Sequence, residues 1–178
     1  MRMLSAVLAI CATLVGSSAY SDPTGRPTIA PQDLIGAWQL VKTEYAGPKG
    51  PMQDPVFQPS SKGLIIYDRS GWMSVQIYGP ERPQIVEPPS RTSGVVSADD
   101  AKLKAAGFDT YYAYCGTWEF DPKTSSITHH LQSSLLPYET GTDKKRDVAF
   151  DHGQLRLTVH DHRSGEERTR VLTWARVN

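Results

Sequence analysis

The stretch Tyr111–Ser133, YYAYCGTWEFDPKTSSITHHLQS, decides how the chain folds. Its first half alternates aromatic with smaller residues, at the period of a β-strand. Residues 121–124, Asp-Pro-Lys-Thr, then supply the chemistry of a turn. In the second half Ile127 and Leu131 share one face with His129, because successive strand residues point to opposite sides. We therefore expect a β-hairpin whose inward apolar face carries His129 into the interior.

The bulk composition describes one globular domain. The chain has 178 residues, of which 39% are hydrophobic, so it is long enough to bury a hydrophobic core without the help of disulfides or metal ions. Lys plus Arg equals Asp plus Glu at 19 each. This balance gives no reason to expect a nucleic-acid partner or a polybasic membrane contact.

The N-terminal sequence has the pattern of an export signal. An apolar run, Met3–Val15, is followed by Gly16–Ala19, whose small residues suit cleavage after Ala19. The run falls short of the roughly 20 apolar residues that span a membrane. We expect residues 1–19 to be a signal peptide and the mature protein to be periplasmic or secreted. A lipoprotein signal at Cys11 is the alternative reading of the same segment.

Removal of the signal peptide leaves Cys115 as the only cysteine, so no internal disulfide is possible. Cys115 is then either a small buried hydrophobe or a reactive thiol. Residues 20–33 are polar and proline-containing and are expected to form a flexible leader. The domain is expected to occupy residues 34–178.

Strand patterns recur through this domain and are joined by turn-forming residues. Besides the two halves of the central hairpin, strands are predicted at 34–41, 63–67, 72–78, 145–150, 154–160 and 168–177. Two proline-rich segments, 47–59 and 79–94, are expected to be irregular, and whether they form a lid stays open. One helix is predicted from a cap at Ser97 to about Ala106, ending at Gly107. About eight antiparallel strands predict an all-β barrel or sandwich with one short helix.

Motifs at both ends of the domain resemble a known barrel closure. Gly36-x-Trp38 and Trp174-Ala175-Arg176 look like the lipocalin, or calycin, arrangement in which a Trp packs under an Arg of the last strand. Further motifs recur in order: Gly63–Tyr67, Gly71–Ser74, Tyr114–Trp118, Thr128–His130, Gly141–Thr142 and Leu172–Arg176. Together they resemble the bacterial and fungal lipocalin-like domain family over about residues 34–177. The resemblance implies a lipocalin-like barrel with Gly36, Trp38, Trp174 and Arg176 as structural closure.

Two residues could carry chemistry inside such a barrel. His129 is either a buried, hydrogen-bonded histidine, a ligand contact or a catalytic base, since a histidine titrates near neutral pH. Arg146 shares a strand face with Val148 and Phe150. If that face points inward, the guanidinium needs a partner, such as a carboxylate, phosphate or polarised carbonyl on a ligand. An outward Arg146 near a strand end is the alternative.

Aromatic residues form the remaining candidates for a cavity wall. Tyr112, Tyr114 and Trp118 share a face of their strand, either as plain core or as contacts for a hydrophobic ligand. Gln76 lies on the second face of the 72–78 strand, which carries large side chains on both faces, and is a further candidate ligand contact.

No metal or cofactor is predicted. The His160-x-His162 spacing resembles a metal motif, but the alternation of its strand puts both imidazoles on the polar face without a third ligand. No phosphate-binding loop or nucleophile elbow is present in the sequence.

Three functional hypotheses follow. The leading one is a barrel that binds a small, largely hydrophobic molecule, with His129, Tyr114 and Arg146 orienting its polar end. The second is a cofactor-free enzyme, of isomerase, cyclase or hydratase type, that uses His129 as acid or base. The third is a barrel filled by its own side chains, with a structural or interaction role.

Overall fold

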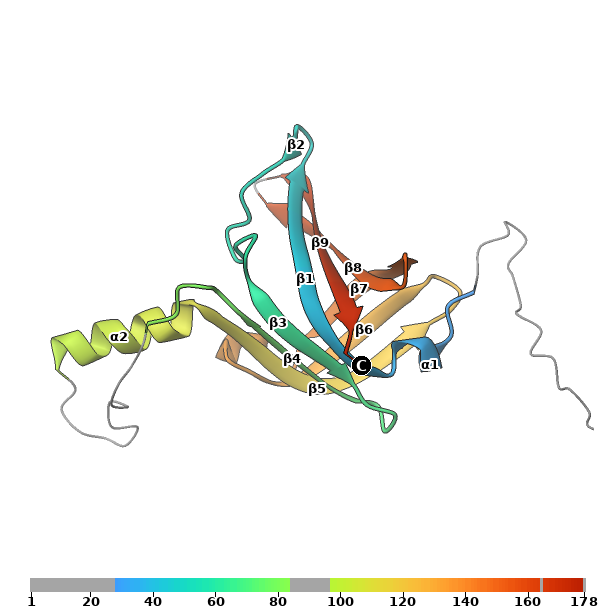
Figure 1. Ribbon diagram of the computed structural model, residues 1–178, viewed down its shortest axis with the longest axis horizontal. Helices are drawn as coiled ribbons and strands as arrows, with labels where there is room; N and C mark the ends of the chain where they lie inside the picture. The colour runs from blue at the N-terminus through green and yellow to red at the C-terminus, as the bar shows by residue number, and fades with distance from the viewer. Residues whose placement is uncertain (1–27, 84–96, 164, 178) are drawn as a thin grey trace, which may run out of the picture.

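A single antiparallel sheet closes on itself to form the body of the protein (Figure 1). The structure is a computed structural model that describes residues 28–83, 97–163 and 165–177. The strands follow the order β2-β1-β3-β4-β5-β6-β7-β8-β9, and β1 also pairs with β9. The long strands therefore make a closed eight-stranded barrel, to which β2 adds a two-residue extension. This confirms the predicted all-β barrel.

The elements are bounded as follows. The strands are β1 (Gly36–Gly47), β2 (Gly50–Pro51), β3 (Lys62–Tyr67), β4 (Trp72–Tyr78), β5 (Tyr111–Asp121), β6 (Ser126–Ser134), β7 (Asp143–Asp151), β8 (Gln154–Arg163) and β9 (Glu166–Arg176). The helices are α1 (Pro31–Leu34), α2 (Ala98–Asp109) and the 3-10 turn η1 (Pro137–Glu139). The described part of the segment 79–94 ends at residue 83, so the rest of that irregular prediction lies outside the described residues, as does the predicted signal peptide.

The central hairpin forms as its alternation predicts. β5 and β6 pair from Asp121↔Ser126 through Trp118↔His129, and a bulge interrupts the register between Cys115 and Gly116. At that bulge a Cβ on Gly116 would collide with the backbone carbonyl of His130. Only glycine lets the two strands approach this closely.

Burial follows the period of two that the sequence predicts. Met73, Val75 and Ile77 of β4 are buried, while Trp72 and Tyr78 are 49% and 38% exposed on the other face. His129 lies on the buried face of β6 and has no exposed surface. The core also contains Leu34, Trp38, Ile65, Tyr67, Ile127, Leu131, Leu155, Leu157 and Trp174. The core of the barrel is therefore one continuous apolar cluster that surrounds a histidine.

One end of the barrel is sealed as the resemblance implied. The Arg176 guanidinium lies over the Trp38 ring, 4.1 Å from its centroid. It also donates to the carbonyls of Ile35 at 2.7 Å and Asp33 at 2.6 Å. Gly36, at φ +136°, leaves room for this guanidinium because a Cβ there would lie 2.7 Å from Arg176 Nη1. Trp174 takes a different role: it is buried in the core opposite Leu40 and Leu155.

Two details differ from the sequence prediction. Residues 31–34 form the helix α1 within and just after the range predicted as a flexible leader, and Ile29 packs against the core. The helix α1 is fixed to the barrel because Leu34 is fully buried and its carbonyl accepts a hydrogen bond from the Trp38 indole at 2.8 Å. The helix α2 continues through Gly107 to Asp109, since a single glycine costs an exposed helix only about 1 kcal/mol.

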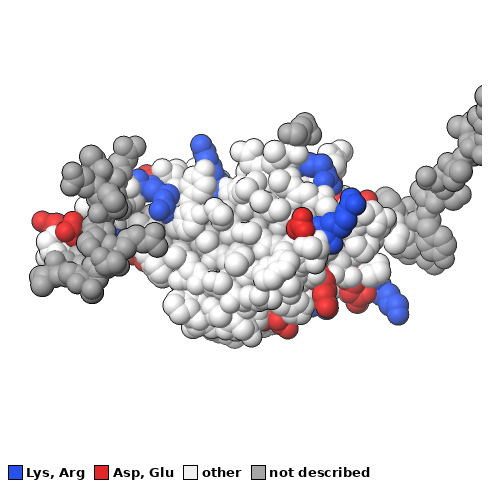
Figure 2. Space-filling view, turned by 90° about the horizontal axis from the view of Figure 1, so that it is seen from below, with Lys and Arg blue, Asp and Glu red and all other residues white. Residues whose placement is uncertain are grey.

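Outside the barrel lie the helix α2 and the charged side chains of the surface. α2 extends away from the barrel and buries none of its residues (Figure 1). Figure 2 shows that the face seen from below is largely free of charged side chains, which gather toward its two ends. Within the described residues, no helix has the length and apolar character needed to cross a membrane.

Candidate functional site

A cavity of about 440 Å³ opens at the end of the barrel away from the Trp38–Arg176 closure. The register of the strands gives this position: Arg176 pairs with Trp38, while the cavity is lined further along β9 by Arg170 and Leu172. Its apolar walls are Phe57, Val75, Ile77, Leu136, Val159 and Leu172, together with Val56. A volume of this size falls in the range of about 300–1,000 Å³ found for small-molecule sites.

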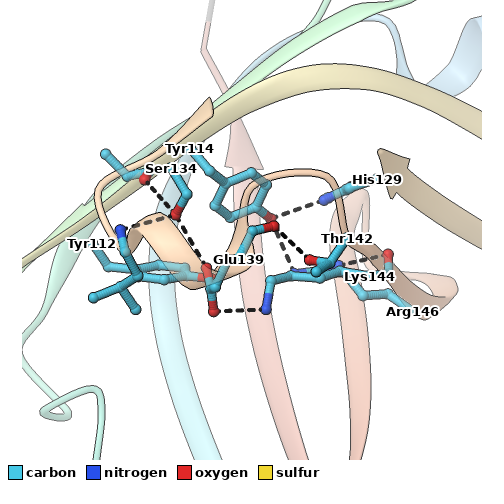
Figure 3. Close-up of polar contacts among 10 residues, drawn as sticks. Tyr112, Tyr114, His129, Ser134, Glu139, Thr142, Lys144 and Arg146 are labelled. Atoms are coloured by element: carbon cyan, nitrogen blue, oxygen red, sulfur yellow. Dashed lines mark hydrogen bonds and ion pairs between the residues drawn. The ribbon is translucent and has the colours of Figure 1, made fainter. Parts of the chain in front are cut away.

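Glu139 lines the cavity and is the centre of a group of polar contacts, which Figure 3 shows. The Glu139 carboxylate is 9% exposed, although it is charged, because three donors surround it. Lys144 Nζ donates to Oε1 at 2.8 Å, while the Tyr112 hydroxyl at 3.0 Å and the Ser134 hydroxyl at 3.2 Å donate to Oε2. Lys144 therefore balances the charge of this buried carboxylate, and the three donors satisfy its oxygens.

Next to this group a second network joins Arg146, Tyr114 and His129 (Figure 3) and continues to Tyr67. Arg146 Nη2 donates to the Tyr114 hydroxyl oxygen at 3.0 Å. The same hydroxyl lies 2.8 Å from Nδ1 of His129, and Nε2 of His129 lies 2.8 Å from the Tyr67 hydroxyl. Tyr67, His129 and Tyr114 are buried, and of these only Tyr114 lines the cavity, together with Arg146. The order from cavity to core is thus Arg146, Tyr114, His129, Tyr67.

Burial sets the protonation states in this network. It lowers the pKa of His129 well below the ordinary value, and the positive charge of Arg146 acts in the same direction. Burial also raises the pKa of the Tyr114 phenol and, with the neighbouring Tyr114 ring, that of the Tyr67 and Tyr112 phenols. The imidazole and the three phenols are therefore neutral at physiological pH.

A segment between β2 and β3 also borders the cavity. Phe57 is 8% exposed and meets the Tyr112 ring edge-on at 5.8 Å between centroids. Asp54 holds this segment to β9 by accepting two hydrogen bonds from Arg170, at 2.6 Å and 2.8 Å. The Arg170 guanidinium also lies 4.9 Å from the centroid of the Tyr45 ring. The proline-rich segment 47–59 is thus fixed across part of the cavity edge.

The structure brings together three of the predicted ligand contacts. Tyr112, Tyr114 and Arg146 all line the cavity. His129 does not reach it, because it has no exposed surface and both ring nitrogens face tyrosine hydroxyls. The predicted inward direction of Arg146 is correct, and the guanidinium is half-buried.

Two predicted contacts lie elsewhere, and the structure removes them from the candidate site. Gln76 is exposed on the outer face of β4, where its side-chain oxygen accepts a hydrogen bond from Tyr111. Trp118 lies toward the sealed end, where its indole donates to the carbonyl of Asp68 and its ring contacts Tyr67. Trp118 differs from the prediction because of its position along β5. It lies four residues beyond Tyr114, and its side chain is therefore outside the cavity, toward the closed end of the barrel.

The remaining histidine and cysteine candidates do not form a metal site or a disulfide among the described residues. His160 borders the cavity and pairs with Asp147 at 2.8 Å and with Glu167 at 3.7 Å. In the described parts of the chain, no three His, Cys, Asp or Glu side chains are placed to hold a metal ion. Cys115 is a free thiol of intermediate exposure.

Comparison with known proteins identifies the family. A family model described as a lipocalin-like domain matches residues 35–177. This chain belongs to the lipocalin-like domain family. A search of curated proteins finds no match. The family assignment agrees with the closed barrel, and a lipocalin-like barrel is a fold compatible with binding small molecules.

Several residues of the lipocalin-like cavity were not predicted as site residues. Lys144 extends the alternation of Arg146 and Val148 by one step, so the sequence pattern could have found it. Arg170 likewise alternates with the buried residues Leu172 and Trp174 of β9. Glu139 carries no such signal, because it belongs to the irregular turn η1 and enters the cavity only through the folding of that turn.

Proposed function

We propose that this protein binds a small, largely hydrophobic molecule inside the cavity of its lipocalin-like barrel. The observation that carries the proposal is the mixed lining of the cavity: apolar residues of β4, β8, β9 and the 47–59 segment form part of its wall, and tyrosine and charged side chains form the rest. An apolar body would lie against Val75, Ile77, Val159 and Leu172, where burial removes its surface from water. Its polar end would lie at Tyr114 and Arg146.

The geometry favours binding over direct catalysis by His129. A general base must come within hydrogen-bond reach of the proton that it removes. Here Tyr114 lies between His129 and the cavity, and the imidazole has no exposed surface. The observed cavity also argues against a barrel filled entirely by its own side chains.

We further propose that the protein acts outside the cytoplasm, in the periplasm or the medium. The support is the sequence Met3–Val15 followed by Gly16–Ala19, which has the pattern of a cleaved export signal. The intact mass of the protein recovered from periplasm and medium tests this directly. A mature chain that begins near Tyr20 is expected, and a full-length chain confined to the cytoplasm would contradict it.

The binding proposal is tested with N-phenyl-1-naphthylamine, a neutral probe whose fluorescence rises in an apolar environment. Saturable binding to the wild-type protein is expected. Val159→Trp should weaken it at least about tenfold, since the new ring occupies the cavity next to Leu172. The matched control is Ile66→Trp, at a position that is 40% exposed on the outside of β3.

The control should bind the probe as the wild type does. Absence of saturable binding to the wild-type protein would contradict the proposal. Equal binding by both tryptophan variants would also contradict it, because the probe would then lie outside the cavity.

A further inference from the structure

Arg146 is a positive charge that the protein leaves without a matching carboxylate. Nη1 donates to the carbonyl of Lys144 at 2.8 Å, and Nη2 donates to the Tyr114 hydroxyl at 3.0 Å. Both acceptors are neutral, and no carboxylate of the described residues forms an ion pair with this guanidinium. A half-buried charge without a counterion is costly, and the cost is removed when a partner of opposite charge binds.

Two other charged residues of the cavity wall, Lys144 and Arg170, each form an ion pair with a carboxylate. Glu139 pairs with Lys144 at 2.8 Å, and Arg170 pairs with Asp54 at 2.6 Å. Arg146 lies two residues from Lys144 on the same face of β7, yet it takes no part in either pair. Arg146 is therefore a positive charge of the cavity wall that forms no ion pair with a carboxylate of the described residues.

The protons of the buried network can be assigned by counting donors and acceptors. Arg146 can only donate, so the Tyr114 oxygen accepts from it. The neutral His129 ring has one N–H and one bare nitrogen, each 2.8 Å from a tyrosine hydroxyl. For the buried Tyr67 hydroxyl, His129 Nε2 is the acceptor available among the described residues.

The assignment that satisfies all these groups has Tyr67 donating to Nε2 and Nδ1–H donating to Tyr114. The reverse order would leave the Tyr67 hydroxyl proton buried without an acceptor, which costs about 1–3 kcal/mol. In the favoured order the Tyr114 oxygen accepts from both His129 and Arg146. Its own O–H is then free to donate into the cavity that Tyr114 lines.

We infer that the molecule bound here is a monocarboxylic acid with an apolar tail, whose carboxylate accepts hydrogen bonds from the Tyr114 hydroxyl and the Arg146 guanidinium. This inference rests on the proposed binding function and specifies its ligand class. A carboxylate carries the one negative charge that Arg146 lacks and offers only acceptors. A doubly charged phosphate fits less well, because the Glu139 carboxylate stands on the same side of the cavity.

The experiment compares two competitors that differ only in their polar end. Dodecanoate and dodecan-1-ol each displace N-phenyl-1-naphthylamine from the protein at about pH 8, below the concentration at which dodecanoate aggregates. Dodecanoate should bind about tenfold to a hundredfold more tightly, as expected for hydrogen bonds to a charged group. Equal displacement by acid and alcohol would overturn the inference while leaving the binding function intact.

Substitutions test which residues cause the preference for the acid over the alcohol. Arg146→Gln should reduce the acid-to-alcohol ratio to near one, and Tyr114→Phe should reduce it several-fold. The control Lys62→Gln removes the same charge from an exposed position outside the cavity and should keep the wild-type ratio. A wild-type ratio in Arg146→Gln would overturn the assignment of the carboxylate to this residue.

The wild-type comparison does not depend on any variant being stable. If Arg146→Gln fails to fold, Arg146→Lys keeps the charge and is expected to keep a preference for the acid. Failure of the wild-type protein to bind probe, acid and alcohol alike would refute the proposed function itself, which is a different outcome from loss of selectivity.

Discussion

The buried imidazole of His129 should make the stability of this protein fall as the pH is lowered from neutrality. Its pKa in the folded state lies well below 6.5, because burial and the Arg146 charge oppose the protonated form. In the unfolded chain the imidazole titrates near its ordinary value of about 6.5. As the pH falls below this value, the unfolded state takes up a proton that the folded state does not, so unfolding is favoured. The stabilisation is complete above the unfolded pKa and is lost between it and the folded pKa.

The magnitude follows from this difference in proton uptake. Each pH unit in that window lowers the free energy of unfolding by at most about 1.4 kcal/mol. Integrated from about pH 8 to about pH 5.5, the loss from His129 alone is about 1.4 kcal/mol. That is a substantial part of the roughly 5–15 kcal/mol that stabilises a typical domain.

The measurement is urea unfolding of the wild-type protein and of His129→Gln at both pH values. Glutamine offers one donor and one acceptor toward Tyr67 and Tyr114 and does not titrate, so it is the matched control. The exposed histidines and the carboxylates are common to both proteins and cancel in the comparison. The wild-type protein should lose about 1.4 kcal/mol more than the variant. Equal losses in both proteins would refute the argument that His129 is held neutral.

Three substitutions test the fold in the same urea assay. Arg176→Lys should lower the free energy of unfolding by about 1–2 kcal/mol. Lysine lacks the planar guanidinium that covers the Trp38 ring and donates to two carbonyls. An unchanged midpoint of urea unfolding would contradict this role of Arg176 in the closure. Gly116→Ala should cost about 4 kcal/mol or more, since its Cβ would collide with the His130 backbone. Gly71→Ala, at φ +88° in open space, should cost only about 1–2 kcal/mol of backbone strain, and equal costs for the two glycines would show that β5 and β6 separate easily.

A considerable part of the site could be predicted from the sequence. The alternation around His129 predicted that it is buried, and the alternation of Arg146 with Val148 predicted an inward guanidinium. The aromatic face of β5 placed Tyr112 and Tyr114 toward the interior. These predictions are correct because a strand has a period of two, so one reliable inward residue fixes the direction of its neighbours.

The alternation of residues along a strand does not show how far along the barrel axis each residue lies. Trp118 shares a face with Tyr114 but lies toward the sealed end, and Gln76 lies on the outer face of a strand whose two faces both carry large side chains. Whether a residue lines a cavity depends on its height in the barrel and on what the neighbouring strands place opposite it. Those relations are set by strand register, which the sequence of one strand does not contain.

The sequence by itself determined the barrel, its strand directions and its closing residues, because hydrophobic alternation, turn residues and the two tryptophan motifs are local signals. Only the tertiary structure decided which polar residues meet at the cavity. It brought Glu139 of η1 to Lys144 of β7, and it enclosed His129 of β6 between Tyr67 of β3 and Tyr114 of β5. These residues come from different elements, and their protonation and charge balance depend on burial and on partners distant in sequence. No local pattern records such long-range interactions, so the chemistry of the site appears only once the barrel has closed.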